Sequence, residues 1–210
     1  MQTLLDALVG SLDMLVSLDP RLFQIIGLTL RVTLTSLLIS CVIGLPIGAA
    51  LGLTQRMPTP GLFVALLYTG MGLPPVVVGL LVFVLLSRAG PLGALGWLFT
   101  PSAMISAQSI IAVPMVIGLT MSAVSSVDPA LRMQLHCLGA TRVQTIITML
   151  VEAKLGVLAA IAAAYGRIVA EVGAVMLVGG NIEGNTRVLT SAIVLETRKG
   201  SFALALALGL

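Results

Sequence analysis

Long apolar stretches without a single charged residue follow one another along this chain. The charge-free ranges are 32–55, 57–87 and 89–127, and a fourth strongly apolar stretch runs from about residue 156 to residue 179. A helix that crosses the hydrocarbon core of a bilayer needs about 20 such residues. The pattern therefore predicts an all-α integral membrane protein with spans near 32–53, 62–87, 102–124 and 156–179.

Both ends of the chain depart from this pattern. Residues 3–17 place leucines on one side of a helix and aspartates elsewhere, which predicts an amphipathic helix at the membrane surface, within an interfacial segment of residues 1–24. No basic stretch precedes it, so we expect no cleaved signal peptide. Residues 201–210 are apolar, but as a helix they would rise only about 15 Å, half a bilayer. We therefore expect about five spans, the fifth truncated at Leu210.

A long polar interruption between two predicted spans runs from Asp128 to Glu152. Asp128 followed by Pro129 predicts the start of a helix, because the carboxylate accepts from free N–H groups and proline has no N–H to leave unpaired. Gly139 suits the left-handed residue that ends such a helix. The apolar residues of this helix recur at i, i+4 and i+7 on one face: Leu131, Leu135 and Leu138.

A second amphipathic helix is predicted directly after Gly139. Thr141 and Gln144 have the spacing of a capping box, which satisfies backbone N–H groups at a helix start. The apolar residues of this helix are Val143, Ile146, Ile147, Leu150 and Val151. The segment could simply connect two spans, but two capped helices indicate a surface built for contact with another protein.

Two charged residues, Arg167 and Glu171, lie in the fourth predicted span. An unpaired charge near the bilayer centre costs about 2.5–3.5 kcal/mol on insertion scales. The i, i+4 spacing would place both side chains on one helix face, close enough to pair. Small neighbours permit close helix packing: Gly166, Ala170, Gly173 and Ala174. The pair is compatible with two roles, a structural lock between helices or a gate on a transport route.

Three of the predicted spans contain proline, which removes a backbone N–H and bends a helix. The positions are Pro46, the pair Pro74 and Pro75, and Pro114. Bent helices are either ordinary kinks or the lining of a transport route, and the adjacent pair favours the route.

Composition excludes several other classes of protein. Of the 210 residues 58% are hydrophobic and 9% are charged, against about a quarter charged in soluble domains, and a soluble chain of this size could not bury so much apolar surface. The net charge of +3 is too small to indicate nucleic-acid binding. Cys41 lies in a span and Cys137 in the polar loop, so we expect no disulfide, and with the lone His136 they lack metal-ligand spacing.

Nucleotide-binding and catalytic motifs are missing from the sequence. There is no phosphate-binding GxxxxGK(S/T) loop, no GxSxG and no HExxH. We therefore expect no enzymatic activity and no cofactor in this chain, so that a separate subunit must bind ATP and Mg²⁺ if ATP drives transport. One bundle of five or six spans is also too thin to enclose a route, which indicates a dimer with its two-fold axis along the pore.

The polar segment resembles the coupling loop of the permeases of ATP-binding-cassette importers. The pattern of that loop is Glu-Ala-Ala, three residues, Gly, nine residues, then Ile-x-Leu-Pro. Gly139 followed by Ala140 matches the Gly, and residues 133–135 stand at Glu-Ala-Ala. Met149 stands at the Ile, and residues 151–152 replace Leu-Pro. Met133 in place of the Glu removes the polar contact with the ATPase that the family pattern implies.

One subfamily is similar over a larger part of the chain. Residues 73–93, 128–132 and 171–200 resemble the permeases of tungstate importers, with molybdate and sulfate permeases as near relatives. The resemblance covers about residues 25–210, and the segment 171–200 is its most specific part.

This resemblance implies a single permease domain, residues 1–210, in the inner (plasma) membrane of a prokaryotic cell. It implies a homodimer with ATPase subunits that contact residues 125–155 in the cytoplasm, and an external oxyanion-binding protein on the side of residues 180–200. Tungstate is the first expected substrate, molybdate the second. The implied coupling residues are Asp128, Leu131, Arg132, Met133, Leu138, Gly139, Ala140 and Thr141. The implied route or gate residues are Arg167, Glu171, Gly173, Pro74 and Pro75.

Two questions stay open at this point. The arginine and lysine residues do not favour one side of the membrane, so the orientation follows from the resemblance alone. An ion-coupled secondary transporter is an alternative, because Arg167 and Glu171 are ionisable residues within a span. Against it, the sequence has no inverted repeat of the kind such transporters contain.

Overall fold

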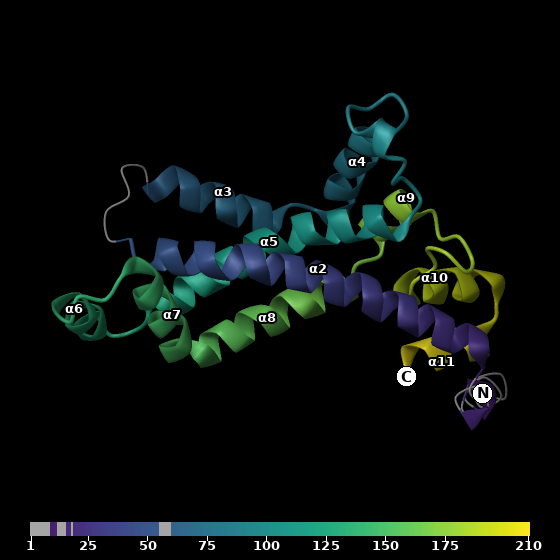
Figure 1. Ribbon diagram of the computed structural model, residues 1–210. Coiled ribbons are helices and arrows are strands. Elements are labelled where there is room, and N and C mark those ends of the chain that lie inside the picture. Colours follow the sequence, from purple (N-terminus) through teal and green to yellow (C-terminus); the bar gives the residue numbers. More distant parts are fainter. Residues whose placement is uncertain (1–8, 12–15, 18, 55–59) are drawn as a thin grey trace. The chain divides into compact units, whose positions relative to one another are not determined.

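The computed structural model describes residues 9–11, 16–17, 19–54 and 60–210 (Figure 1). These residues form helices and turns, with no strand among them, which confirms the predicted all-α fold. The amphipathic helix predicted over residues 3–17 falls mostly outside the described residues. The helices are α2 (Pro20–Gly52), α3 (Pro60–Gly72), α4 (Pro75–Leu86), the 3₁₀ helix η1 (Gly93–Leu95), α5 (Pro101–Ser125), α6 (Pro129–Cys137), α7 (Arg142–Glu152), α8 (Lys154–Val169), α9 (Gly173–Gly179), α10 (Leu189–Lys199) and α11 (Phe202–Gly209).

Two described helices, α2 and α5, are long and apolar enough to cross a membrane. The number rises to 4 if each of two bent helix pairs counts as one span, α3 with α4 and α7 with α8. The predicted span 102–124 corresponds to α5. The predicted span 32–53 is the larger part of α2, which already begins at Pro20.

Two predicted spans are interrupted: the span 62–87 at the proline pair, where a bend was predicted, and the span 156–179, where a continuous helix was predicted. Between Gly72 and Pro75 the helix breaks, because the residue before a proline is forced out of the helical region and the proline pair supplies no N–H. The segment 156–179 is divided between α8 and α9. By contrast, α2 and α5 continue as helices through Pro46 and Pro114, since an isolated proline removes a single helical hydrogen bond.

The described chain separates into two compact units, of which the first comprises residues up to 35 together with 75–108 and 169–210. In it α9 packs closely on α4, because Gly79 has no side chain: an added Cβ would lie 2.5 Å from the Ala174 Cα. The Phe99 N–H donates to the Val178 carbonyl at 2.9 Å, which attaches the loop before α5 to α9. A separate cluster joins the first turns of α2 to α10 and α11: Leu22, Ala192, Ala207 and Leu208.

The second unit comprises residues 36–74 and 109–168. Within it the end of α2 lies against α5 along glycines that recur every fourth residue, Gly44, Gly48 and Gly52. A Cβ at Gly48 would lie 2.6 Å from the Ile117 carbonyl oxygen, so the two backbones are in contact, as in small-xxx-small helix pairs. Buried residues of α5 and α8 form an adjoining core: Ala112, Val116, Ala164 and Ile168.

Candidate functional site

The polar segment between α5 and α8 folds into the two predicted short helices. At the start of α6 the Ala130 N–H donates to the Asp128 carboxylate at 2.8 Å, and Pro129 is the first helical residue. At the start of α7 the Gln144 N–H donates to Thr141 Oγ1 at 3.3 Å, while the Thr141 N–H donates to Gln144 Oε1 at 2.8 Å. Both predicted caps are confirmed, and they satisfy N–H groups that a helix start leaves without partners.

A tight bend at Gly139 joins the two helices. Gly139 has a φ of +72°, the left-handed conformation that was predicted there. Its N–H donates to the His136 carbonyl at 3.1 Å, and the Ala140 N–H donates to the Leu135 carbonyl at 3.0 Å. These are the two hydrogen bonds of a Schellman motif. The bend is therefore held by backbone geometry and not by side-chain packing.

The inward faces of α6 and α7 pack on one buried cluster of the second unit: Ala49, Val124, Met149 and Ala153. Leu131 and Leu135 of α6 pack against this cluster, as do Ile146 and Leu150 of α7. Leu138 is instead 82% exposed. The predicted apolar face of α6 is wrong at Leu138, because the buried cluster contacts Leu131 and Leu135 and does not extend to Leu138.

Large apolar side chains remain exposed on either side of the bend. Met133 is 67% exposed and Val143 is 66% exposed, and Leu138 lies between them in the chain. Ala140 is half-buried. Exposed apolar residues on an otherwise polar segment are compatible with contact with another protein or with the membrane. We call Met133, Leu138, Ala140 and Val143 the coupling surface.

The remaining predicted coupling residues lie around this surface. Asp128 and Thr141 are exposed and Arg132 is half-buried. On α7 the apolar residues divide into two faces: Val143, Ile147 and Val151 are exposed. Ile146, Met149 and Leu150 belong to or pack on the buried cluster. The sequence carries apolar residues on both faces of α7, so periodicity alone could not distinguish the core face from the exposed one.

The predicted pairing of Arg167 and Glu171 on one helix face is wrong. Helix α8 ends at Val169, so the two residues do not share a helix. The Ala174 N–H donates to Glu171 Oε1 at 2.9 Å, which satisfies one of the free N–H groups at the start of α9. The Glu171 carbonyl accepts from Thr190 Oγ1 at 3.0 Å. Glu171 is therefore tied to the start of α9 and to α10.

The other predicted route residues fall into different units. Gly173 opens α9 next to the first turn of α4, where a Cβ on it would contact Val76 Cγ2. The first unit thus brings together Pro75 at the start of α4, Glu171 and Gly173. Arg167 belongs to the second unit and lies in the last turn of α8, where the negative end of the helix dipole favours a positive charge. Pro74 closes the 36–74 segment of the second unit.

Among the residues that the structure describes, no group of three or more His, Cys, Asp and Glu side chains lies close together. What the described residues present is a group of exposed apolar side chains on α6 and α7 and a close helix junction between α4 and α9.

The sequence is similar to those of known transport proteins. The sequence is 42% identical over 193 residues to a probable anion ABC transporter permease protein of Haloferax volcanii, covering 90% of this chain and 83% of that protein. It is 37% identical over 210 residues to the tungstate uptake system permease protein TupB of Peptoclostridium acidaminophilum, covering 100% of this chain and 92% of that protein. No protein-family model matches the sequence.

A solved structure has a similar fold. It is described as the MetNI methionine ABC transporter in inward-facing conformations, and it matches with a TM-score of 0.69 at 18% identity. The match covers 90% of this chain and 87% of that chain. At this level of identity the likeness concerns the fold alone.

Proposed function

Because this chain belongs to the permease subunits of ATP-binding-cassette transporters, we propose that it is the membrane-spanning subunit of an importer for a tetrahedral oxyanion, in the first place tungstate. The observation that carries the proposal is the similarity to a tungstate uptake permease over the whole of this chain. The importer lies in the inner (plasma) membrane of a prokaryotic cell. An ion-coupled secondary transporter is not retained, since the relatives are ABC transporter permeases.

In this proposal the chain has no ATPase site of its own. It forms a homodimer, each copy engages an ATPase subunit that binds ATP and Mg²⁺, and an external binding protein delivers the anion. The coupling surface on α6 and α7 meets the ATPase. The opposite face of the same helices belongs to a buried cluster with residues of α2 and α5. Because this core is close-packed, a displacement of the coupling surface by the ATPase would move the helices of the unit together.

The route and its gate are assigned to the junction of α4 and α9. Glu171 holds the start of α9 through Ala174, and Gly173 lets that start approach Val76. We assign Glu171 and Gly173 the positioning of this junction, next to the helix break at Pro74 and Pro75. Arg167 supplies positive charge at the end of α8.

The substrate can be tested in whole cells. In cells that lack other oxyanion importers, expression of the complete transporter should restore uptake of tungstate at low concentration, measured as cell-associated tungsten. Molybdate, with the same shape and charge, should compete more weakly than unlabelled tungstate, and sulfate should compete little. Cells that carry the empty vector serve as the control. Equal competition by sulfate and tungstate would contradict the substrate while leaving the permease class intact.

The proposed orientation makes a second prediction. Single cysteines at Gln134 and Asn185, both exposed, are introduced in a background without Cys41 and Cys137. A membrane-impermeant maleimide should label position 185 on intact cells and position 134 only after the membrane is permeabilised. Gln134 lies outside the capping box of Thr141 and Gln144, so its replacement leaves the start of α7 intact. Labelling of both positions from outside would rule out a cytoplasmic coupling surface.

A further inference from the structure

Phe99, in the loop between η1 and α5, has a backbone conformation that its side chain disfavours. Its φ is +61°, in the left-handed region, where a Cβ crowds the following carbonyl oxygen. The other residues with positive φ that the structure describes are glycines and one asparagine, Asn181, which tolerate this region. A bulky residue persists in such a conformation only where its surroundings impose it, and such residues concentrate at functional sites.

Three contacts hold Phe99 between α4 and α9. Its N–H donates to the Val178 carbonyl in the last turn of α9 at 2.9 Å. Its ring meets the ring of Phe83 on α4 edge to face, with centroids 6.2 Å apart and an interplanar angle of 66°. The same ring lies on Gly180, where an added Cβ would be 2.9 Å from Phe99 Cδ1. Phe99 therefore connects the end of α9 to α4.

This connection completes a row of contacts along one face of α4. Val76, Gly79 and Phe83 follow one another at i, i+3 and i+7, so they lie on one side of the helix. The first two contact the start of α9. The step of seven residues from Val76 to Phe83 is a rise of about 10 Å, and the 7 residues of α9 span about the same length. Because α9 ends in glycine and Gly180 follows, neither position has a side chain to reach α4, and Phe99 supplies the contact instead.

Hydrogen bonds fix the loop that follows Gly180. The Thr186 hydroxyl donates to the carbonyl of the last residue of α9 and accepts from the Ile182 N–H at 2.9 Å. Where the loop meets α10, the Leu189 N–H donates to Thr29 Oγ1 of α2 at 2.9 Å. The end of α9 is therefore anchored, and a movement of α4 relative to α9 must break the aromatic contact.

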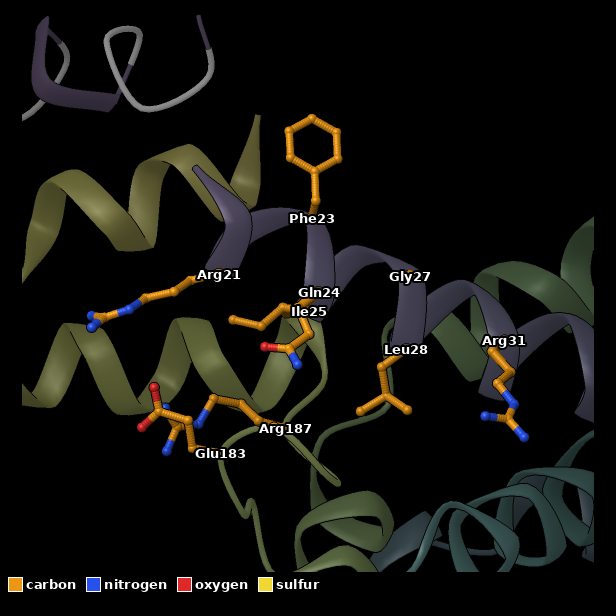
Figure 2. A pocket seen from close by; sticks show the side chains of 10 residues that line it. Arg21, Phe23, Gln24, Ile25, Gly27, Leu28, Arg31, Glu183 and Arg187 are labelled. Atoms are coloured by element: carbon orange, nitrogen blue, oxygen red, sulfur yellow. The ribbon is translucent and has the colours of Figure 1, made fainter. Parts of the chain in front are cut away.

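Figure 2 shows this loop beside the start of α2. A cavity of about 300 Å³ lies between them, and its charged lining residues are Arg21, Arg31, Glu183 and Arg187. Arg187 pairs with Glu183 at 3.2 Å within the loop, while the side chains of Arg21 and Arg31 run in opposite directions along α2 (Figure 2). The arginines do not converge on one point, so the loop is fixed by its own contacts and not by a ligand in the cavity.

We propose that Phe99 is a positioning residue for the gate. Its ring contacts with Phe83 and Gly180, here called the latch, hold the end of α9 on α4 until the loaded binding protein docks. The proposal rests on the proposed function, which assigns the gate to the junction of α4 and α9. Phe99 is 42% exposed and lies next to the loop that carries Asn185, the external side in that function, so a docked protein can reach it. The free energy of one aromatic pair biases a two-state junction and is small enough to be overcome in each transport cycle.

The test is ATP hydrolysis by the purified full transporter in nanodiscs, with and without its tungstate-loaded binding protein. Phe99→Ala keeps a side chain with a Cβ at the left-handed position and removes only the ring. The basal rate should rise, and the ratio of stimulated to basal hydrolysis should fall by about two- to tenfold, the shift of a two-state equilibrium on loss of one aromatic pair. The concentration of binding protein that gives half of the maximal rate should stay the same. Phe99→Tyr, which keeps the ring, should retain the wild-type ratio.

Two glycines provide a matched pair of variants. Gly180 and Gly184 have φ values of +71° and +74°, so alanine strains the backbone to a similar extent at either position. A Cβ at Gly180 would lie 2.9 Å from the Phe99 ring, whereas one at Gly184 would meet nothing within 4 Å. Gly180→Ala should therefore lower the ratio as Phe99→Ala does, and Gly184→Ala should keep it. Trp97→Ala should also keep it, because this ring of the same loop is 41% exposed and lies outside the aromatic pair.

Several outcomes would overturn the proposal. A lower unfolding temperature of Phe99→Ala with the wild-type ratio of rates would show that the ring only stabilises the fold. Recovery of the ratio at higher concentrations of the binding protein would make Phe99 a docking contact. Equal effects of Gly180→Ala and Gly184→Ala would assign the change to backbone strain. The basal rate needs no anion, so an unaltered basal rate in Phe99→Ala would remove the latch whatever the substrate is. A raised basal rate together with a wild type that does not take up tungstate would remove the proposed substrate alone.

Discussion

Replacing Ala140 by glutamate should abolish tungstate uptake while the permease still folds and inserts in the membrane. Ala140 follows the left-handed Gly139, and its N–H is already used in the hydrogen bond to Leu135. A carboxylate at this half-buried position would enter an apolar contact without a partner. An uncompensated buried charge costs about 3–5 kcal/mol. This cost would raise the dissociation constant of the contact with the ATPase more than about a hundredfold. We therefore expect uptake to fall to the background of cells without the permease.

The control for this change is Ala140→Ser, which adds a small neutral group and should keep most of the uptake. Purified Ala140→Glu transporter should contain all subunits when isolated in mild detergent or should lose only the ATPase. Where the ATPase is retained, ATP hydrolysis should no longer respond to the loaded binding protein. Normal uptake by Ala140→Glu, measured with radiolabelled tungstate, would show that the bend does not contact the ATPase.

Replacing Gly48 by leucine should prevent accumulation of folded permease. A Cβ at Gly48 would already lie 2.6 Å from the Ile117 carbonyl oxygen and 2.8 Å from the Thr120 Cβ. The carbonyl is part of the backbone of α5 and cannot rotate away, so α2 and α5 would have to separate. The smaller change Gly48→Ala should lower the free energy of unfolding of the permease by about 1–3 kcal/mol, the usual cost of overpacking.

Gly166 of α8 provides the control, because alanine at this position should not lower the stability of the permease. A Cβ at Gly166 would meet nothing within 4 Å, so Gly166→Ala should be neutral or stabilising, by up to about 1 kcal/mol from helix propensity. The measurement is the thermal unfolding midpoint of the purified transporter, followed by the loss of the monodisperse peak after heating. If Gly48→Ala and Gly166→Ala unfold at the same temperature, the close contact of α2 with α5 is not what stabilises the second unit.

The division of the fourth predicted span changes how its charges are understood. On a continuous helix Arg167 and Glu171 would neutralise each other. In the structure Arg167 lies at the end of α8, and Glu171 accepts a hydrogen bond at the start of α9. A positive charge is stabilised at a helix C-terminus and a negative one at an N-terminus. Each charge therefore has a stabilising helix end of its own, and no pairing between them is needed to account for their presence.

Much of the coupling segment was predictable from the sequence because its determinants are local. The Asp128 cap, the left-handed Gly139 and the Thr141–Gln144 box each depend on groups within a few residues of one another. Side-chain hydrogen bonds over such short separations need no tertiary partner, and glycine alone takes a positive φ without strain. The all-helical membrane class is equally local, since it follows from the length of uninterrupted apolar stretches.

Local reasoning failed where a distant segment decides the outcome. Glu171 could continue α8 or hold α9, and the observed choice is supported by Thr190, far along the chain. The apolar residues of α7 fit either face, and only the cluster around Met149 determines which ones turn inward. Leu138 is exposed because the buried cluster that contacts Leu131 and Leu135 does not extend to it.

The sequence by itself determined where the helices near the coupling bend begin and end, and that the chain belongs in a membrane, because short-range hydrogen bonds and apolar run length depend on neighbouring residues alone. The tertiary structure alone decided that Gly44, Gly48 and Gly52 are a contact with α5, and that Arg21 and Arg31 share a cavity with Arg187. These relations join residues from distant parts of the chain. They arise because close packing and charge proximity depend on distances in space, which periodicity along one segment does not encode.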